Sequence, residues 1–141
     1  MPKIRVMFVC IHNSARSQMC EAFVRHWADD RVEAQSSGIE SGTLNPLVVR
    51  AMEEIGISMD GQWAKGAQEF IDRQETFDYV ITVCDESSAE RCPTFPGNAI
   101  GLHWPFADPS ARSGTDDDKI AQIRPIRDAI AEKVRAWLAS L

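Results

Sequence analysis

The chain has 141 residues, of which 44% are hydrophobic, and its 15 basic and 21 acidic residues give a net charge of −6. That length and composition suit one domain with a sizeable core, which we expect to span residues 1–141. The acidic balance argues against nucleic acid as a partner, and no apolar run is long enough for a membrane span or a signal peptide. We therefore expect a cytoplasmic protein, and we expect it to be a monomer.

The first predicted elements are a buried strand and a helix joined by a short polar loop. Residues 3–9 are apolar and β-prone, which predicts the strand. After Arg16, the apolar residues Met19, Phe23 and Trp27 recur at the spacing of one helix face. Residues 32–37 then predict a second, short strand.

The next predicted helix begins at the dipeptide Asn45-Pro46 and ends at Gly56. Asparagine is a good N-cap, proline suits the first helical position and glycine ends helices well. The apolar residues of this segment share one face, which we expect to be buried. They are Leu47, Val48, Ala51, Met52 and Ile55.

Two further strands and a long helix complete the pattern. Residues 77–83 and 98–102 predict buried strands, and residues 116–140 predict the last helix. Pro125 lies inside that helix, so we expect a kink or a second helical segment there. Strands that alternate with helices predict an α/β fold with a parallel sheet of about four strands and helices on both faces. Ligands of such sheets bind at the carboxyl ends of the strands.

The loop between the first strand and the first helix carries the clearest chemical signal. It places Cys10 at the end of a strand and Arg16 at the start of a helix. Backbone N–H groups in such a turn, together with the positive end of the helix, form a concavity that binds a tetrahedral anion. We expect this oxyanion cradle to consist of Ile11, His12, Asn13, Ser14, Ala15, Arg16 and Ser17.

Cys10 has the surroundings of a nucleophilic thiol. Helix N-termini and neighbouring guanidinium groups favour the thiolate, which is the reactive form. The planar fork of Arg16 matches two oxygens of a phosphate-like ion. Ser14 or Ser17 could donate a hydrogen bond to the sulfur, and Asn13 could brace the loop or cap the helix.

Two other cysteines point to redox chemistry. Four cysteines are too few for a disulfide scaffold in a chain of this length, so they are better interpreted as catalytic, redox-active or buried. Cys84 directly follows the predicted strand 77–83 and should lie at the same sheet edge as Cys10. Cys92 follows after a wholly polar segment, which suits a disulfide relay whose partners must approach and separate. Cys20 falls within the first helix and is expected to pack as a small core residue.

The Cys-x5-Arg-Ser loop resembles that of the low molecular weight protein tyrosine phosphatases, and the remaining motifs resemble the thioredoxin-coupled arsenate reductases of the same fold. The resemblance covers nearly the whole chain. Phosphatases of this fold carry Asp-Pro-Tyr where this chain has Asp108-Pro109-Ser110. The other matching motifs are Asn13-Ser14, Arg16-Ser17-Gln18-Met19, Ser37-Gly38-Ile39-Glu40, Asn45-Pro46, Val83-Cys84-Asp85, Cys92-Pro93 and His103-Trp104.

The resemblance implies a three-cysteine mechanism without a cofactor. Cys10 attacks arsenate held by Arg16, and Asp108 helps to protonate the departing oxygen. Cys84 then attacks Cys10 and releases arsenite, and Cys92 attacks Cys84. Thioredoxin reduces the final Cys84–Cys92 disulfide, and phosphate or sulfate would bind as analogues of the substrate. Phosphate hydrolysis with Cys10, Arg16 and Asp108 remains an alternative, as does a thiol redox sensor or oxyanion-binding module without turnover.

The chain departs from the family pattern at two places. Cys84 and Cys92 are separated by seven residues, one more than we expect for the family, which a surface loop should tolerate. Some members bind potassium near the loop, and Asn13, Glu21 and Ser36 match three of its ligands. Lys65 stands where the fourth, an aspartate, would be. We therefore expect no metal, with the Lys65 ammonium in the place of the cation.

Overall fold

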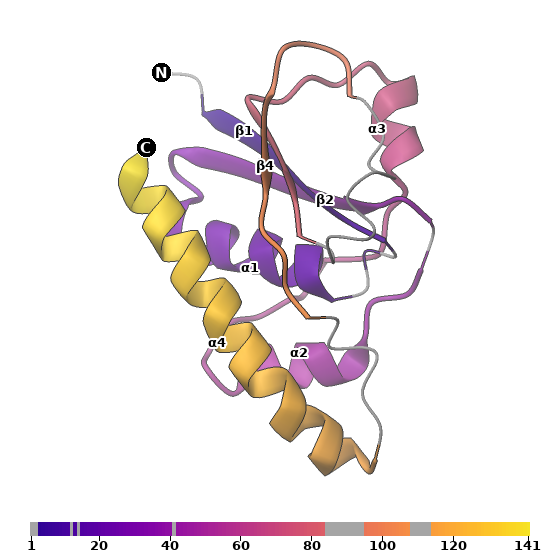
Figure 1. Ribbon diagram of the computed structural model, residues 1–141, viewed down its shortest axis with the longest axis vertical. Helices are drawn as coiled ribbons and strands as arrows, with labels where there is room; N and C mark the ends of the chain where they lie inside the picture. Colours follow the sequence, from indigo (N-terminus) through magenta and orange to yellow (C-terminus); the bar gives the residue numbers. More distant parts are fainter. Residues whose placement is uncertain (1–2, 12, 14, 41, 84–94, 108–113) are drawn as a thin grey trace.

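The computed structural model describes residues 3–11, 13, 15–40, 42–83, 95–107 and 114–141. Its centre is a parallel four-stranded sheet with the strand order β2-β1-β3-β4 (Figure 1). The strands are β1 (Ile4–Cys10), β2 (Val32–Gly38), β3 (Tyr79–Thr82) and β4 (Ile100–His103). The α/β class and the parallel sheet predicted from the sequence are confirmed.

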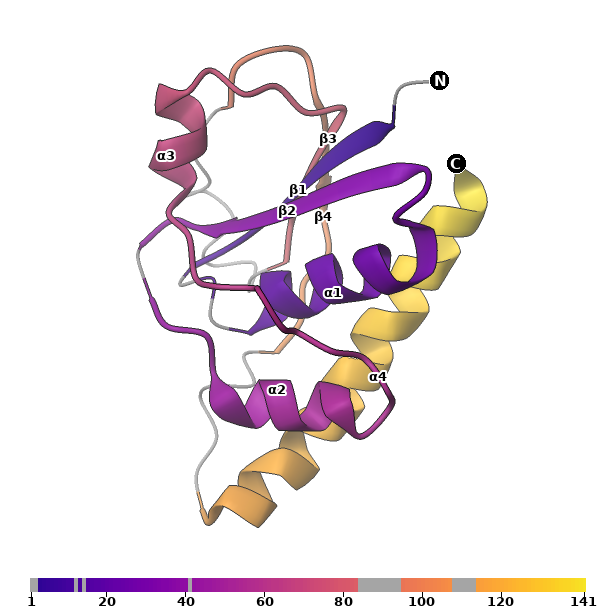
Figure 2. The same cartoon turned by 180° about the vertical axis from the view of Figure 1, so that it is seen from behind.

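Helices cover both faces of the sheet. Helix α1 (Arg16–Ala28), α2 (Pro46–Glu53) and the long α4 (Asp116–Ser140) lie on one side, and the short α3 (Ala67–Asp72) lies on the other (Figures 1 and 2). No helix in the described part of the chain is long and apolar enough to cross a membrane.

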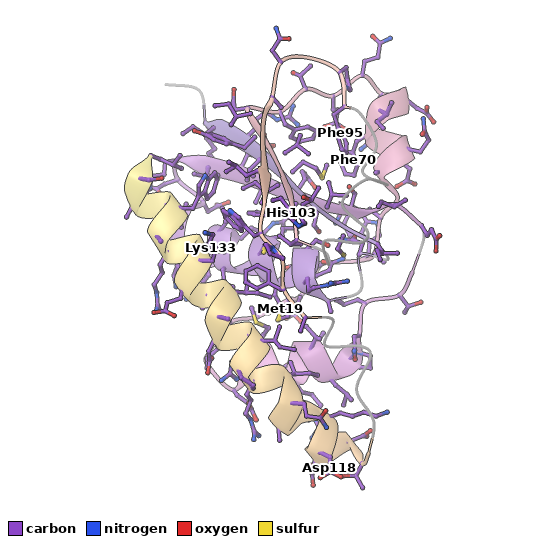
Figure 3. All side chains as sticks on the ribbon, viewed as in Figure 1. Met19, Phe70, Phe95, His103, Asp118 and Lys133 are labelled. Atoms are coloured by element: carbon purple, nitrogen blue, oxygen red, sulfur yellow. The ribbon has the colours of Figure 1, made fainter. Side chains whose placement is uncertain are left out.

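Strand β1 separates two hydrophobic clusters because its side chains alternate between the faces of the sheet. Val6, Phe8 and Cys10 belong to the larger cluster with α1, α2 and α4, whereas Met7 and Val9 belong to the smaller one with α3. All five are buried. Figure 3 shows the two clusters through Met19, among the helices, and through Phe70 and Phe95, which lie together near α3. Cys10 therefore ends the central strand on the side where α1 begins.

The helix boundaries follow the predicted capping signals. The side chain of Asn45 accepts a hydrogen bond from the Leu47 N–H (3.0 Å), and Gly56 adopts a left-handed φ of 77° after α2. Thr115 and Asp118 form a capping box at the start of α4. Pro125 lies within this single helix, so the predicted alternative of a second helical segment is wrong.

Two predictions about the middle of the chain are wrong, and one helix was missed. The strand predicted as buried at residues 98–102 is β4, an edge strand in which Ile100 is 54% exposed. Ile55 was assigned to the buried face of the second helix, but it is 43% exposed because α2 ends at Glu53 and the chain turns away at Gly56. The helix α3 was not predicted, because only two of its six residues, Ala67 and Phe70, are buried and no helical repeat is visible in so short a segment.

Candidate functional site

The candidate site begins where β1 ends. Cys10 pairs with Gly38 of β2, and the carbonyls of Cys10 and Ile11 accept hydrogen bonds from the N–H groups of Ile39 (3.0 Å) and Glu40 (2.7 Å). These bonds extend the sheet past the strand and fix the direction in which the loop leaves it. His12 and Ser14, both predicted for the oxyanion cradle, lie outside the described residues.

The thiol of Cys10 is 2% exposed and faces two hydrogen-bonding groups of the loop and the helix. The backbone N–H of Asn13 donates to its Sγ at 3.1 Å, and the Ser17 Oγ lies 2.9 Å from the same sulfur. The Asn13 N–H is one donor to the sulfur, and in the contact with Ser17 either the hydroxyl or the thiol is the donor. The prediction that Ser17 contacts the sulfur is confirmed.

Asn13 braces the loop and does not cap the helix. It adopts a left-handed φ of 55°, which asparagine tolerates better than most residues. Its Nδ2 donates to Ser17 Oγ (2.7 Å), and its Oδ1 accepts from the Lys65 backbone N–H (2.8 Å) and from Gln18 Nε2 (2.9 Å). The N-cap of α1 is Ala15, whose methyl side chain cannot accept a hydrogen bond from the N–H groups of the first turn.

Arg16 begins α1 and is 4% exposed. Its Nη1 donates to the carbonyl of Phe106 (3.0 Å), and it makes further contacts. The bond to Phe106 connects the start of α1 to the segment that follows β4. A buried guanidinium held in this way is ready to bind a planar or tetrahedral oxyanion in a fixed orientation.

A buried ion pair lies next to this loop. Lys65 is 6% exposed, and its Nζ lies 3.5 Å from Glu21 Oε1, which also accepts a hydrogen bond from Ser36 Oγ (2.7 Å). Burial lowers the pKa of the Lys65 ammonium, and the Glu21 carboxylate opposes that shift. Among the described residues, the other oxygen of Glu21, Oε2, makes no hydrogen bond and has an ion pair with Arg25 Nε at 3.2 Å.

The three residues that match potassium ligands of the family, Asn13, Glu21 and Ser36, have other hydrogen-bond partners in this chain. Asn13 Oδ1 accepts two N–H groups, and Glu21 Oε1 faces the hydroxyl of Ser36 and the ammonium of Lys65. Asn13 Oδ1 and Glu21 Oε1 are therefore already bound by donors, and Glu21 Oε2 has an ion pair with Arg25. In the described part of the chain, no group of three His, Cys, Asp or Glu side chains could hold a metal ion either.

The other three predicted catalytic residues, Cys84, Cys92 and Asp108, lie outside the described residues. Val83 is the last described residue before Cys84, and its N–H donates to the carbonyl of Val9 (2.9 Å), one residue before Cys10. The convergence of Cys84 with Cys10 remains a prediction. Cys20 is fully buried in α1, and this burial raises the pKa of its thiol well above the ordinary value.

Apart from Lys65, which the family resemblance placed beside the loop, sequence reasoning missed the segment between α2 and α3 as part of the site. Gln62 donates to the Gln18 side chain (2.8 Å), Gln18 donates to the carbonyl of Trp63 (2.8 Å), and the backbone of Lys65 contacts Asn13. Figure 2 shows this segment crossing the first turn of α1. Nothing local in the sequence marks these contacts, because they join residues more than 40 positions apart.

Comparisons with known proteins agree with this geometry. The family model described as low molecular weight phosphotyrosine protein phosphatase matches residues 5–141. An arsenate reductase from Halalkalibacterium halodurans is 37% identical over 139 residues, which cover 97% of this chain and 96% of that protein.

Solved structures point the same way. An arsenate reductase in a phosphate-binding state superposes on this chain with a TM-score of 0.77 at 29% sequence identity. The superposition covers 97% of this chain and 98% of that protein chain. A thioredoxin-dependent arsenate reductase from Corynebacterium glutamicum gives a TM-score of 0.68 at 27% identity, with 99% of this chain and 62% of its own covered.

Proposed function

The chain belongs to the low molecular weight phosphotyrosine protein phosphatase family, and we propose that it reduces arsenate to arsenite at Cys10. The proposal rests on several relatives over nearly the full length that are arsenate reductases. The observation that carries the proposal is the Cys10 sulfur, which ends the central strand and faces the Asn13 N–H and the Ser17 hydroxyl. This arrangement supports a nucleophilic thiolate beneath an oxyanion site.

The first chemical step is displacement at arsenic. The Cys10 thiolate attacks arsenate and forms a sulfur–arsenic bond, and one arsenate oxygen leaves as water. We assign to Asp108 the role of the acid that protonates this departing oxygen. Arg16 and the backbone N–H groups of the loop hold the remaining oxygens. Arsenic is still pentavalent at this stage, so the step needs no reductant.

The electrons come from the thiols in the second step. The Cys84 thiolate attacks the sulfur of Cys10, the sulfur–arsenic bond breaks, and its electron pair leaves with arsenic as arsenite. Cys92 then attacks Cys84 and frees Cys10 as a thiolate. We propose that thioredoxin in the cytoplasm reduces the Cys84–Cys92 disulfide, which restores the resting enzyme.

The test is arsenate-dependent oxidation of NADPH in the presence of thioredoxin and thioredoxin reductase. The wild type should turn over, and Cys10→Ser, Cys84→Ser and Cys92→Ser should not. Cys20→Ala is the matched control, because Cys20 is buried in the core and takes no part in the relay. Multiple turnover by Cys92→Ser with thioredoxin would show that the last exchange step is wrong.

The same variants separate the alternatives. Hydrolysis of p-nitrophenyl phosphate without any arsenate turnover would identify a phosphatase that uses Cys10, Arg16 and Asp108. Silence of the wild type in both assays, combined with oxyanion binding, would identify a redox sensor or a binding module.

We also propose that turnover does not depend on potassium, since the Lys65 ammonium faces Glu21 where the cation would lie. Rates in potassium and sodium buffers of equal ionic strength should agree. A strong requirement for potassium would contradict this.

A further inference from the structure

Lys65 connects two parts of the site that the sequence keeps far apart. Its backbone N–H donates to the side chain of Asn13 in the catalytic loop (2.8 Å), while its ammonium faces the buried carboxylate of Glu21 (3.5 Å). The Nζ also donates to the carbonyl of Trp63 (3.1 Å) and lies 4.6 Å from the centre of the Trp63 ring. The carbonyl of Lys65 accepts from Gly38 at the end of β2 (2.8 Å).

The Lys65 backbone N–H (2.8 Å) and the Gln18 Nε2 donor (2.9 Å) together determine which way the Asn13 amide faces. A backbone N–H can only donate, so the Asn13 atom that it meets is the acceptor Oδ1. The amide nitrogen Nδ2 then lies on the opposite side, 2.7 Å from Ser17 Oγ. Because an amide NH2 can only donate, Ser17 Oγ is the acceptor in that bond.

The hydroxyl proton of Ser17 is thereby available for the sulfur of Cys10, 2.9 Å away. The bonds form one polarised chain, in which each donor strengthens the next. It runs from the Lys65 N–H through the Asn13 amide and the Ser17 hydroxyl to Cys10. A reversed amide would present an oxygen to Ser17 and draw the hydroxyl proton away from the sulfur.

The Lys65 side chain holds its own backbone in place. The ammonium is buried between Glu21 and the carbonyl of Trp63, which also accepts from Gln18 (2.8 Å). Removal of the ammonium would leave the Glu21 carboxylate buried without this partner, which is strongly unfavourable, and the segment around residue 65 would shift to relieve it. The Lys65 N–H would then lose its position against Asn13.

We propose that Lys65 is a positioning residue for the nucleophile, and that its anchored backbone N–H orients Asn13 so that Ser17 donates to Cys10. The inference rests on the proposed function only in taking Cys10 as the nucleophile. It assigns to the chain's own ammonium the task of holding the Glu21 carboxylate, and it defines the route from that ion pair to the sulfur.

The test measures the rate at which iodoacetamide alkylates Cys10 as a function of pH. In a Cys20→Ala, Cys84→Ser, Cys92→Ser background, Cys10 is the only thiol. Lys65→Met should slow alkylation at about pH 6 by roughly three- to tenfold and move the midpoint of the profile to higher pH, because the thiolate loses a donor. Lys3→Met, an exposed lysine, is the matched control and should leave the profile unchanged.

A double-mutant cycle shows whether Lys65 acts through Ser17. Ser17→Ala removes the last donor of the chain, so Lys65→Met in the Ser17→Ala background should change the alkylation rate by less than about twofold. Equal effects of Lys65→Met with and without Ser17 would overturn the proposed route. An unchanged profile in Lys65→Met alone would overturn the positioning role altogether.

The readout is independent of arsenate chemistry. If the protein proved not to reduce arsenate, the turnover assay would fail while the alkylation profile still tested Lys65. Should Lys65→Met not fold, as judged by loss of cooperative thermal unfolding, Lys65→Gln takes its place. It keeps a donor toward Glu21 without the charge, and a profile shift in the same direction is expected, whereas an unchanged profile would refute the proposal.

Discussion

The two ends of β1 each carry a densely hydrogen-bonded residue, but in opposite environments. Near the amino end, the Arg5 side chain donates to Glu33 (2.9 Å), Glu75 (2.9 Å) and the carbonyl of Thr76 (2.6 Å), and it is 30% exposed. At the carboxyl end, Cys10 is 2% exposed and its partners are neutral amide and hydroxyl groups.

This difference indicates at which end of the strand the loss of a hydrogen-bond partner is more costly in free energy. Water can replace a lost partner of Arg5, so that cluster tolerates change at low cost. Cys10, Asn13 and Ser17 are buried, so a partner lost there leaves a polar group that carries a high desolvation cost. The amino end of the sheet is thus held by interchangeable contacts, and the carboxyl end by contacts that must all be present.

Asn13→Ala, at the carboxyl end of β1, should have the largest effect on stability and activity. It removes the acceptor of the Lys65 N–H and one of the acceptors of Gln18 Nε2, and it places alanine at a left-handed φ. We expect a loss of about 2–4 kcal/mol in the free energy of unfolding and a fall in arsenate kcat/KM of about 100-fold or more. Urea unfolding and the coupled turnover assay measure the two. Asn98→Ala, an exposed asparagine, is the control, and equal effects in both variants would contradict the comparison.

The two described cysteines offer a second test. Burial raises the pKa of Cys20, so this thiol stays protonated at neutral pH, and it is shielded from reagents as well. In the Cys84→Ser, Cys92→Ser protein, iodoacetamide should modify Cys20 at least about tenfold more slowly than Cys10. Peptide mass spectrometry after timed alkylation distinguishes them. Equal rates would show that donors around Cys10 do not determine its reactivity.

Local patterns in the sequence predicted the strands and helix ends, and tertiary contacts account for what they missed. The strand 3–9 and the Asn45 cap are visible because apolar runs and capping residues act over a few positions. The contact between Asn13 and Lys65 joins residues 52 positions apart through a backbone N–H, which is the same for almost every residue type. The resemblance to potassium-binding relatives places Lys65 near Asn13, but no local pattern in the sequence predicts this hydrogen bond.

The candidate site divides in the same way. Cys10, Arg16 and Ser17 were identified because a nucleophile, an anion-binding group and a helix start follow one another in the chain. The sequence indicates no role for Gln18, since a glutamine in a helix usually points to solvent. Its burial follows from the segment that crosses α1, which the sequence did not predict.

Arg5→Met should affect the other end of β1 only mildly. The variant loses exposed ion pairs with Glu33 and Glu75 but retains apolar packing on the Phe77 ring, 4.7 Å from the guanidinium carbon in the native chain. We expect a loss of about 1 kcal/mol in the free energy of unfolding and an unchanged kcat/KM. A substantial loss of turnover in a folded Arg5→Met protein would show that the two ends of the strand are coupled.

The smallest expected effect concerns a second ion cluster, between α2 and α4, in which Glu54 and Arg124 are exposed and Arg127 is buried. Hydrogen bonds from Arg124 and Arg127 lower the pKa of Glu54 from 4.5 to about 2. A lowered carboxyl pKa stabilises the folded state above the unfolded pKa, and this stabilisation is lost as pH falls through the folded value. The stability difference between the wild type and Glu54→Gln should therefore be constant above about pH 4.5 and shrink toward pH 2. Thermal unfolding across this range measures it. Because Glu54 is exposed, added salt should diminish the difference, and a salt-independent difference would show that exposed clusters in this protein are not as replaceable as the Arg5 end suggests.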